Sequence, residues 1–78
     1  MQKFKINLST IQDVKKFVNI VNKFDTELDL VSGKYTVDGK SIMGIFSLDL
    51  LKPIELVVHS DNAADLLAEI EPFRVKEK

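Results

Sequence analysis

The chain is arranged around one stretch, which reads Lys40-Ser41-Ile42-Met43-Gly44-Ile45-Phe46-Ser47-Leu48. The dipeptide before it, Asp38-Gly39, is typical of a tight turn that delivers the chain into this stretch. Ser41 predicts a helix N-cap, because a serine hydroxyl accepts hydrogen bonds from the free amides of a first helical turn. The apolar residues that follow exceed the single stripe with which a helix faces a core, so some are expected to point outward. An outward apolar cluster beside a capping serine is typical of a docking surface.

Four segments on either side predict β-strands, because apolar and polar residues alternate or strand-forming residues dominate: 3–8, 27–31, 34–37 and 54–59. Between the second and the third, Ser32-Gly33 predicts a hairpin turn. One set of alternate positions is apolar and is expected to face a core. The other set is polar and is expected to face water: Lys3, Lys5, Asn7, Glu27, Asp29, Glu55 and His59.

Two longer helices are predicted from apolar spacings of three and four. The first is capped by Ser9 or Thr10, ends near Phe24, and has an apolar face made of Ile11, Val14, Phe17, Val18, Val21 and Phe24. The last is capped by one residue of the segment 60–62, and Pro72 is expected to end it near Glu71. Its apolar positions are Ala63, Leu66, Leu67 and Ile70.

The resulting order is strand, helix, strand, strand, helix, strand, helix. It predicts an α+β fold: a two-layer open-faced sandwich of type βαββαβα, with a four-stranded antiparallel sheet and helices on one face. With 78 residues, the chain has room for one hydrophobic core only. A single domain covering residues 1–78 is therefore expected.

Composition excludes several classes of function. Eleven basic and 12 acidic residues give a net charge of -1, which argues against a nucleic-acid or acidic-membrane partner. The absence of cysteine excludes disulfides, zinc-thiolate sites and thiol catalysis, and it favours a cytoplasmic protein. The polar start of the chain is not typical of a signal peptide, and no apolar run approaches the ~20 residues that span a membrane.

The residues also give little support for an enzyme. No nucleophile with its own base is apparent, and no glycine-rich phosphate loop, so neither catalysis nor a cofactor is predicted. His59 is the one histidine, and a lone histidine near a strand end is typical of a solvated surface residue. A metal site is not predicted, because no second histidine or cysteine accompanies it.

The stretch from Lys40 to Leu48 is very similar to the regulatory-serine segment of the HPr proteins, the small phosphocarriers of the bacterial sugar phosphotransferase system. The order of elements predicted above agrees with the fold of that family. The resemblance implies that Ser41 is phosphorylated by an ATP-dependent kinase. It also implies that Ile42, Met43 and Phe46 form a docking surface for partner proteins. Implied partners are an HPr kinase-type enzyme, a transcriptional regulator or components of the phosphotransferase system.

One departure from the family concerns the histidine that carries its transferable phosphate, within a Gly-Ile-His-Ala-Arg-Pro motif at the start of the first helix. Counted without gaps from Ser41, the place of the histidine falls on Thr10 and the place of the arginine on Gln12. The proline is replaced by Asp13, which brings negative charge to the place of an anion. A phosphohistidine needs an imidazole nitrogen as nucleophile, and the arginine donates to the phosphoryl group.

Three hypotheses follow from this combination. The first is a cytoplasmic HPr-like protein-binding module that is switched at Ser41 and transfers no phosphohistidine. The second is a working phosphocarrier of the phosphoenolpyruvate-dependent sugar phosphotransferase system, which uses an unusual acceptor residue. The third is a structural or dimerising α+β domain with neither activity.

Overall fold

The structure is a computed structural model, and it describes residues 2–75. Its elements are β1 (Gln2–Ile6), α1 (Ile11–Val21), β2 (Leu28–Ser32), β3 (Tyr35–Asp38), α2 (Ile42–Phe46), β4 (Ile54–Val58), α3 (Ala64–Glu69) and the short 3-10 helix η1 (Glu71–Phe73). The predicted order of strands and helices is confirmed, and η1 is added at its end. No helix among these residues has both the length and the apolar content that crossing a membrane requires.

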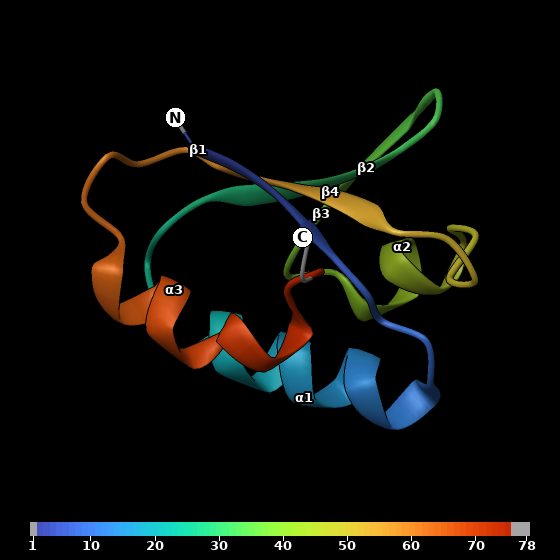
Figure 1. Ribbon diagram of the computed structural model, residues 1–78, viewed down its shortest axis with the longest axis horizontal. Coiled ribbons are helices and arrows are strands. Elements are labelled where there is room, and N and C mark those ends of the chain that lie inside the picture. Colours follow the sequence, from blue (N-terminus) through green and yellow to red (C-terminus); the bar gives the residue numbers. More distant parts are fainter. Residues whose placement is uncertain (1, 76–78) are drawn as a thin grey trace.

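The four strands form one antiparallel sheet in the order β1-β4-β2-β3. The hairpin between β2 and β3 turns at Gly33, whose φ of 60° lies in the left-handed region that favours glycine. All the helices cover the same face of the sheet (Figure 1). The predicted α+β open-faced sandwich is therefore confirmed.

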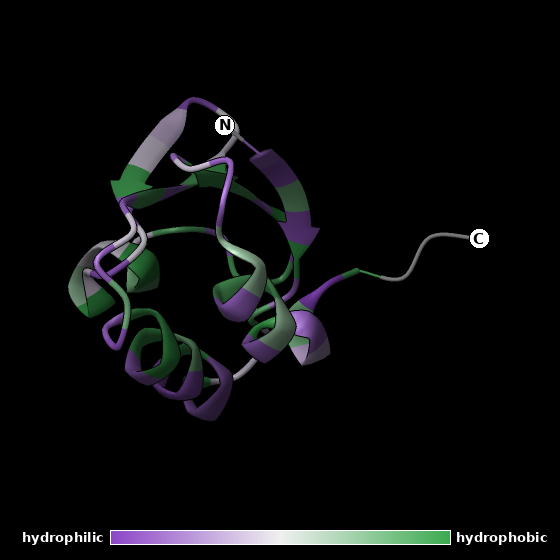
Figure 2. Cartoon of the chain, turned by 90° about the vertical axis from the view of Figure 1, so that its left-hand side faces the viewer, coloured by the Kyte–Doolittle hydropathy of each residue, from purple (hydrophilic) through white to green (hydrophobic). Residues whose placement is uncertain are grey.

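The core lies between the sheet and the helices, where apolar colouring gathers on the inner sides of both layers (Figure 2). Alternate strand residues and one stripe of each helix supply it, as the two periodicities require. Its fully buried members include Ile6, Leu8, Val14, Phe17, Val21, Leu30, Ile45, Ile54, Leu56, Val58 and Ile70.

The other face of the sheet carries the predicted polar side chains, with two apolar strand residues, Val31 and Val57, among them. Val57 is only 7% exposed although it points away from the helices. Lys3 of β1 and Asp29 of β2 stand directly opposite it on the two neighbouring strands. The stems of such flanking side chains cover an apolar residue while their charged ends stay in water.

The helix termini differ from the prediction in three places. α1 ends at Val21 instead of near Phe24, and the Asn22 side chain donates to Val18 O at 2.8 Å just after it. Ile11 was assigned to the apolar face, but its position on the first turn leaves it exposed. No residue of the segment 60–62 caps α3, whose N-cap is Ala63 without a side-chain hydrogen bond. Ser60 Oγ instead accepts from the Asn62 amide at 3.1 Å, which forms a local turn.

The chain after η1 turns onto the outer edge of β1. Asn7 N donates to Phe73 O at 2.8 Å, and Val75 N donates to Lys5 O at 2.9 Å. The Arg74 guanidinium lies 4.7 Å from the centre of the Phe4 ring, which is a cation–π distance. This segment therefore covers one of the two edges of the sheet.

Gly39, which precedes the start of α2, is enclosed by the side chain of a core residue. A Cβ atom at this position would lie 1.8 Å from Leu28 Cδ1, and Leu28 is buried. We expect Gly39→Ala to lower the free energy of unfolding by about 1–3 kcal/mol, because the core must shift to admit the methyl group. Urea denaturation measures this change.

The matched control is Gly44→Ala on α2, where the closest contacts of a new Cβ are 3.3 Å. At this helical position, alanine is favoured over glycine by about 0.5–1 kcal/mol of helix propensity, which offsets the cost of the tighter fit. Equal effects of the two substitutions would contradict the tight packing of Gly39.

Candidate functional site

Three polar side chains lie at the start of α1, the position that the count from Ser41 assigns to the family histidine. Thr10 is the N-cap, and its Oγ1 accepts a hydrogen bond from the Asp13 amide at 3.0 Å. Ser9 Oγ donates to Asp13 Oδ2 at 3.4 Å. The arrangement satisfies the helix terminus with a hydroxyl and an acidic first turn, as capping requires. It offers an alcohol and a carboxylate at this point, and no imidazole.

His59 follows β4 and lies at the opposite end of the sheet. Gln2 pairs with Val58 at that end, whereas Ile6 pairs with Ile54 at the end from which the chain continues to Thr10. The four steps along β1 from Gln2 to Ile6 alone span roughly 14 Å, at about 3.4 Å a residue. His59 and the start of α1 therefore share no pocket.

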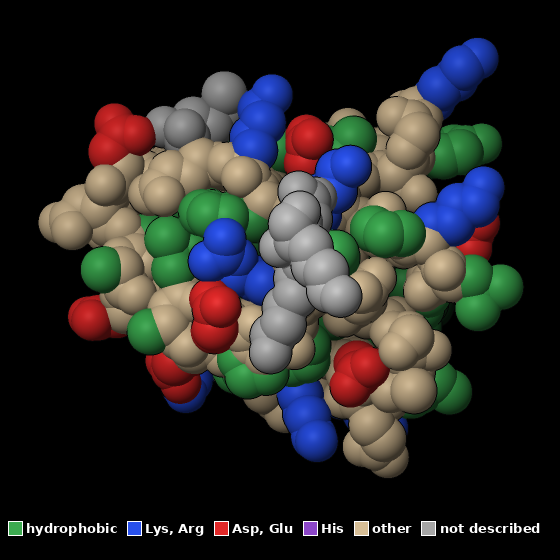
Figure 3. Space-filling view, viewed as in Figure 1, with side chains coloured by type: hydrophobic (Ala, Val, Ile, Leu, Met, Phe, Trp, Pro, Cys, Tyr) green, Lys and Arg blue, Asp and Glu red, His purple; other side chains and the backbone are tan. Residues whose placement is uncertain are grey.

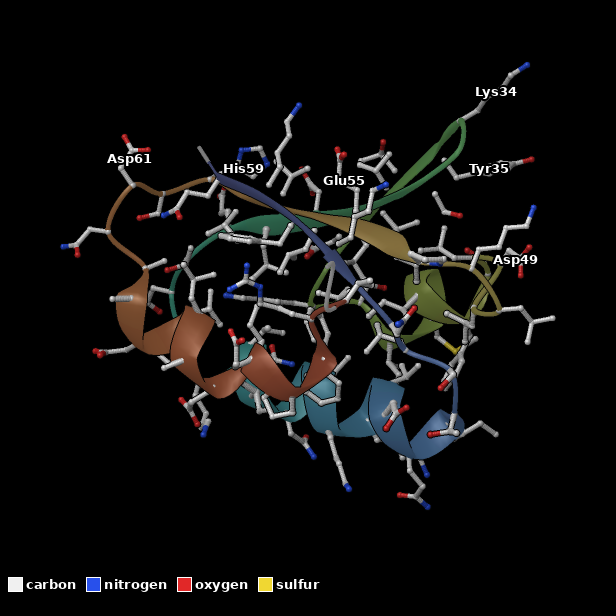
Figure 4. The ribbon with its side chains drawn as sticks, viewed as in Figure 1. Lys34, Tyr35, Asp49, Glu55, His59 and Asp61 are labelled. Carbon is white, nitrogen blue, oxygen red and sulfur yellow. The ribbon has the colours of Figure 1, made fainter. Side chains whose placement is uncertain are left out.

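The partner of His59 is a carboxylate of the neighbouring strand. His59 Nε2 lies 2.7 Å from Asp29 Oδ2, and both side chains are partly exposed. His59 lies on the outer side of the sheet (Figure 4). The His59 amide also donates to Glu27 O at 2.9 Å. These contacts tie the end of β4 to β2. Within residues 2–75, no three His, Asp or Glu side chains are grouped so that they could hold a metal ion.

Ser41 is the N-cap of α2. Its Oγ accepts from the Gly44 amide at 3.2 Å, its carbonyl accepts from the Ile45 amide at 3.0 Å, and the side chain is half-buried. Lys40 Nζ donates to Phe24 O at 2.6 Å, which ties the start of α2 to the chain just after α1. The Lys40 side chain, next to Ser41, therefore reaches the C-terminal side of α1, whereas Thr10 caps the N-terminus of this helix.

The five residues of α2 divide between the core and the surface as helical geometry dictates. Ile45 is fully buried, and Leu48 after the helix is nearly so. On the other side, Met43 is 77% exposed and Phe46 is 38% exposed, three residues apart on one face. Ile42 is half-buried and lies between the two groups. Ile42, Met43 and Phe46 thus form an apolar patch beside Ser41, hereafter the α2 patch. Hydrophobic side chains are visible as separate groups at the right-hand side of Figure 3.

A groove that the sequence did not indicate runs between α1 and the segment around η1. Its volume is about 690 Å³, and it is lined by Asn7, Ser9, Asp13, Lys16, Asn19, Ile20, Glu69, Pro72 and Phe73. The Phe73 ring packs edge-on against Phe17 at 6.0 Å between centroids, which fixes this wall. The groove forms because Pro72 stops α3 and turns Phe73 inward. The sequence predicted that Pro72 ends the last helix, but it did not predict the direction that the chain takes after this residue.

Solved structures of HPr and Crh proteins share this architecture. HPr-C-His from Thermoanaerobacter tengcongensis superposes with a TM-score of 0.77 at 22% sequence identity, over 92% of this chain and 89% of that chain. The phosphocarrier protein HPr of Bacillus anthracis gives 0.70 at 22% identity, over 95% and 94%. The catabolite repression protein Crh of Bacillus subtilis, which forms an intertwined dimer with a swapped domain, gives 0.63 at 23% identity, over 92% and 88%. At these identities the likeness establishes the fold.

The family itself is established by the sequence. The family model described as the PTS HPr component phosphorylation site matches residues 12–74, which is most of the chain. Members of this family are phosphocarriers of the bacterial phosphotransferase system that interact with its proteins, and they are not enzymes. Together with the sheet order and the capped helix at Ser41, this match identifies the protein by family: the chain belongs to the HPr family of the bacterial sugar phosphotransferase system.

Proposed function

We propose that this protein is a regulatory member of the HPr family, which acts by being bound and does not pass on a phosphoryl group from histidine. The proposal rests on the N-cap of α1, which is Thr10 and which is the position that the ungapped count from Ser41 assigns to the family histidine. Its hydroxyl oxygen accepts from the Asp13 amide at 3.0 Å, so it is engaged in capping the helix. A phosphate ester on threonine is far more inert than a phosphohistidine, so it does not suit onward transfer.

Charge at the start of α1 supports the same proposal. The arginine that would hold a phosphoryl group is replaced by Gln12, which is neutral and exposed. Asp13 adds a carboxylate one residue further on, hydrogen-bonded to Ser9. A carboxylate in this place repels an incoming phosphate, because like charges a few ångströms apart raise the energy of both. The sole histidine, His59, lies at the other end of the sheet and is paired with Asp29.

The proposed switch is phosphorylation of Ser41, which alters the affinity of the α2 patch for a partner protein. A phosphate on Oγ carries about -1.5 to -2 charges at neutral pH, and it would sit beside Met43 and Ile42 without entering the core. Proposed partners are an HPr kinase-type enzyme and a transcriptional regulator, and the proposed setting is the cytoplasm, where HPr phosphocarriers work.

Incubation with phosphoenolpyruvate and the first enzyme of the phosphotransferase system tests the absence of carrier activity. We expect no acid-labile phosphate on this protein under conditions that label an authentic HPr fully. His59→Ala is the matched control, because it removes the only imidazole from an exposed site. Acid-labile label that disappears in His59→Ala would identify His59 as an acceptor and would overturn the proposal. Acid-stable label that persists in His59→Ala but is lost in Thr10→Ala would identify a phosphothreonine acceptor and would overturn the proposal as well.

A further inference from the structure

The two edges of the sheet are treated differently by the rest of the chain. The outer edge of β1 is covered by the segment after η1, through the Asn7–Phe73 and Val75–Lys5 hydrogen bonds. β3 is the last strand at the other side, and among residues 2–75 no strand or tail pairs with its outer edge. An uncovered strand edge is a template for pairing with another strand.

The backbone groups that β3 leaves unpaired can be assigned from its register. Gly39 N donates to Leu28 O at 2.9 Å, so the amide of residue 39 faces β2. Amides along a strand alternate between its two sides. The amides of Tyr35 and Val37 therefore face β2, whereas those of Thr36 and Asp38 face the open edge. The Asp38 carbonyl is already paired within the chain, because it accepts from Ser41 N at 3.0 Å.

The residues along this edge are self-complementary about Thr36. We propose that two copies of this chain associate through antiparallel pairing of β3 with β3, with the two-fold axis at Thr36. In this register Thr36 faces Thr36 of the second copy, and each exchanges its free N–H and C=O with the other, which is a hydrogen-bonded antiparallel pair. Each Lys34 faces Asp38 of the other copy, and each Tyr35 faces Val37. An isologous interface requires this kind of pairing.

The charged pair at each end relieves a repulsion that exists within one copy. Asp38 stands directly opposite Asp29 in the β2–β3 pairing, and like charges placed opposite each other destabilise a sheet. Asp29 has His59 as a partner, whereas Asp38 Oδ1 accepts from the backbone amide of Lys40 at 2.9 Å. The Lys40 ammonium itself is directed to Phe24 O. The ammonium of Lys34 from the second copy would supply Asp38 with an opposite charge.

The apolar pair explains an exposed aromatic side chain. Tyr35 is 72% exposed, and it extends from the end of the hairpin beside Lys34 (Figure 4). Val37 is half-buried on the face that packs against the core. Residues two apart on a strand share a face, so Tyr35 of one copy would lie over Val37 of the other. Aromatic and β-branched residues form favourable cross-strand pairs.

The expected dimer is weak because β3 has four residues. Stable interfaces bury about 800 Å² on each partner, which exceeds what this strand provides. We expect a dissociation constant on the order of 0.1 mM. Association of this kind is independent of carrier activity and of phosphorylation at Ser41.

Sedimentation equilibrium between about 0.02 and 1 mM protein, at low salt, tests the proposal. We expect the mean mass to rise toward that of a dimer. Thr36→Pro should keep the protein monomeric, because proline lacks the N–H at the axis, while the fold survives since this N–H does not face β2. Lys34→Glu should raise the dissociation constant roughly tenfold, and Lys15→Glu on the exposed face of α1 serves as the control of equal charge.

Crosslinking locates the axis. Because the chain has no cysteine, Thr36→Cys introduces a single thiol, and the Cα atoms of the axial pair would lie about 5.5 Å apart, within disulfide range. We expect oxidation to crosslink Thr36→Cys at least tenfold faster than Lys15→Cys. A monomer at 1 mM, equal crosslinking rates, or a dimer that survives both Thr36→Pro and Lys34→Glu would overturn the proposal. If the two copies exchanged a different strand, Thr36→Cys and Lys15→Cys would crosslink at equal rates. The faster crosslinking expected for Thr36→Cys would exclude that arrangement.

Discussion

Phe17→Ala is expected to lower the free energy of unfolding by about 3–5 kcal/mol. Phe17 is fully buried at the centre of the α1 face that packs against the sheet, and it contacts the Phe73 ring edge-on. Removing it leaves a cavity that the two layers cannot close without moving α1. Because a domain of this size has a stability of only about 5–15 kcal/mol, the variant is expected to be partly unfolded at 37 °C. Urea denaturation followed by circular dichroism measures the loss.

Phe46→Ala is the matched control, because it makes the same change on α2 at a site that keeps 38% of its surface exposed. Its cost should not exceed about 2 kcal/mol, since less apolar area is lost from the interior. If both variants unfolded at the same urea concentration, the assignment of Phe17 to the centre of the core would be wrong.

Incubation with HPr kinase and ATP is expected to place one phosphate on this protein, at Ser41. Ser41→Ala should abolish the modification completely, and intact-protein mass spectrometry measures it. The substitution also removes the cap hydrogen bond to Gly44, which costs about 1 kcal/mol and leaves the protein folded. Ser47, at the other end of α2, provides the control. Its hydroxyl donates to Gly44 O at 2.6 Å, so Ser47→Ala also removes one hydrogen bond and should be phosphorylated normally.

Met43→Glu tests the α2 patch in the same assay. Met43 is largely exposed, so the substitution should leave the stability unchanged within about 0.5 kcal/mol. A charge at the centre of a docking surface nevertheless costs binding, and we expect kcat/KM of the kinase to fall about 30-fold or more. Leu51→Glu is the control, because Leu51 is 90% exposed in the loop after α2. A protein that the kinase leaves unmodified, or equal losses in the two variants, would refute the proposed switch.

The sequence was most informative where local chemistry and periodicity agree. The alternation in β1 and β4 assigned the core faces correctly, because side chains on a strand alternate strictly between the two faces. Thr10 and Ser41 were expected as N-caps, and both accept the predicted amide hydrogen bonds. The family match also agrees with the similarity noted for residues 40–48.

Predictions failed where a residue depends on what lies beyond its own element. Ile11 fits the apolar stripe of α1 by spacing, yet it is exposed. The stripe extends beyond the part of α1 that packs against the sheet. Ser60, Asp61 and Asn62 all suit an N-cap, yet α3 begins after Ala63. Spacing could not show that Val57 is covered by its neighbours on the open face. Nor could it show that the segment after Pro72 returns to β1 and opens the groove beside α1.

The sequence by itself determined the order of the elements, the fold class and the residue types at each helix start, because these depend on neighbours three or four positions apart. It also determined that no imidazole precedes position 59. Only the tertiary structure decided that His59 lies at the end of the sheet remote from Thr10. It also decided that, within residues 2–75, the segment after η1 covers the β1 edge while no strand pairs with the outer edge of β3. These facts depend on strand order and on where the chain turns, and contacts between residues far apart in sequence set both.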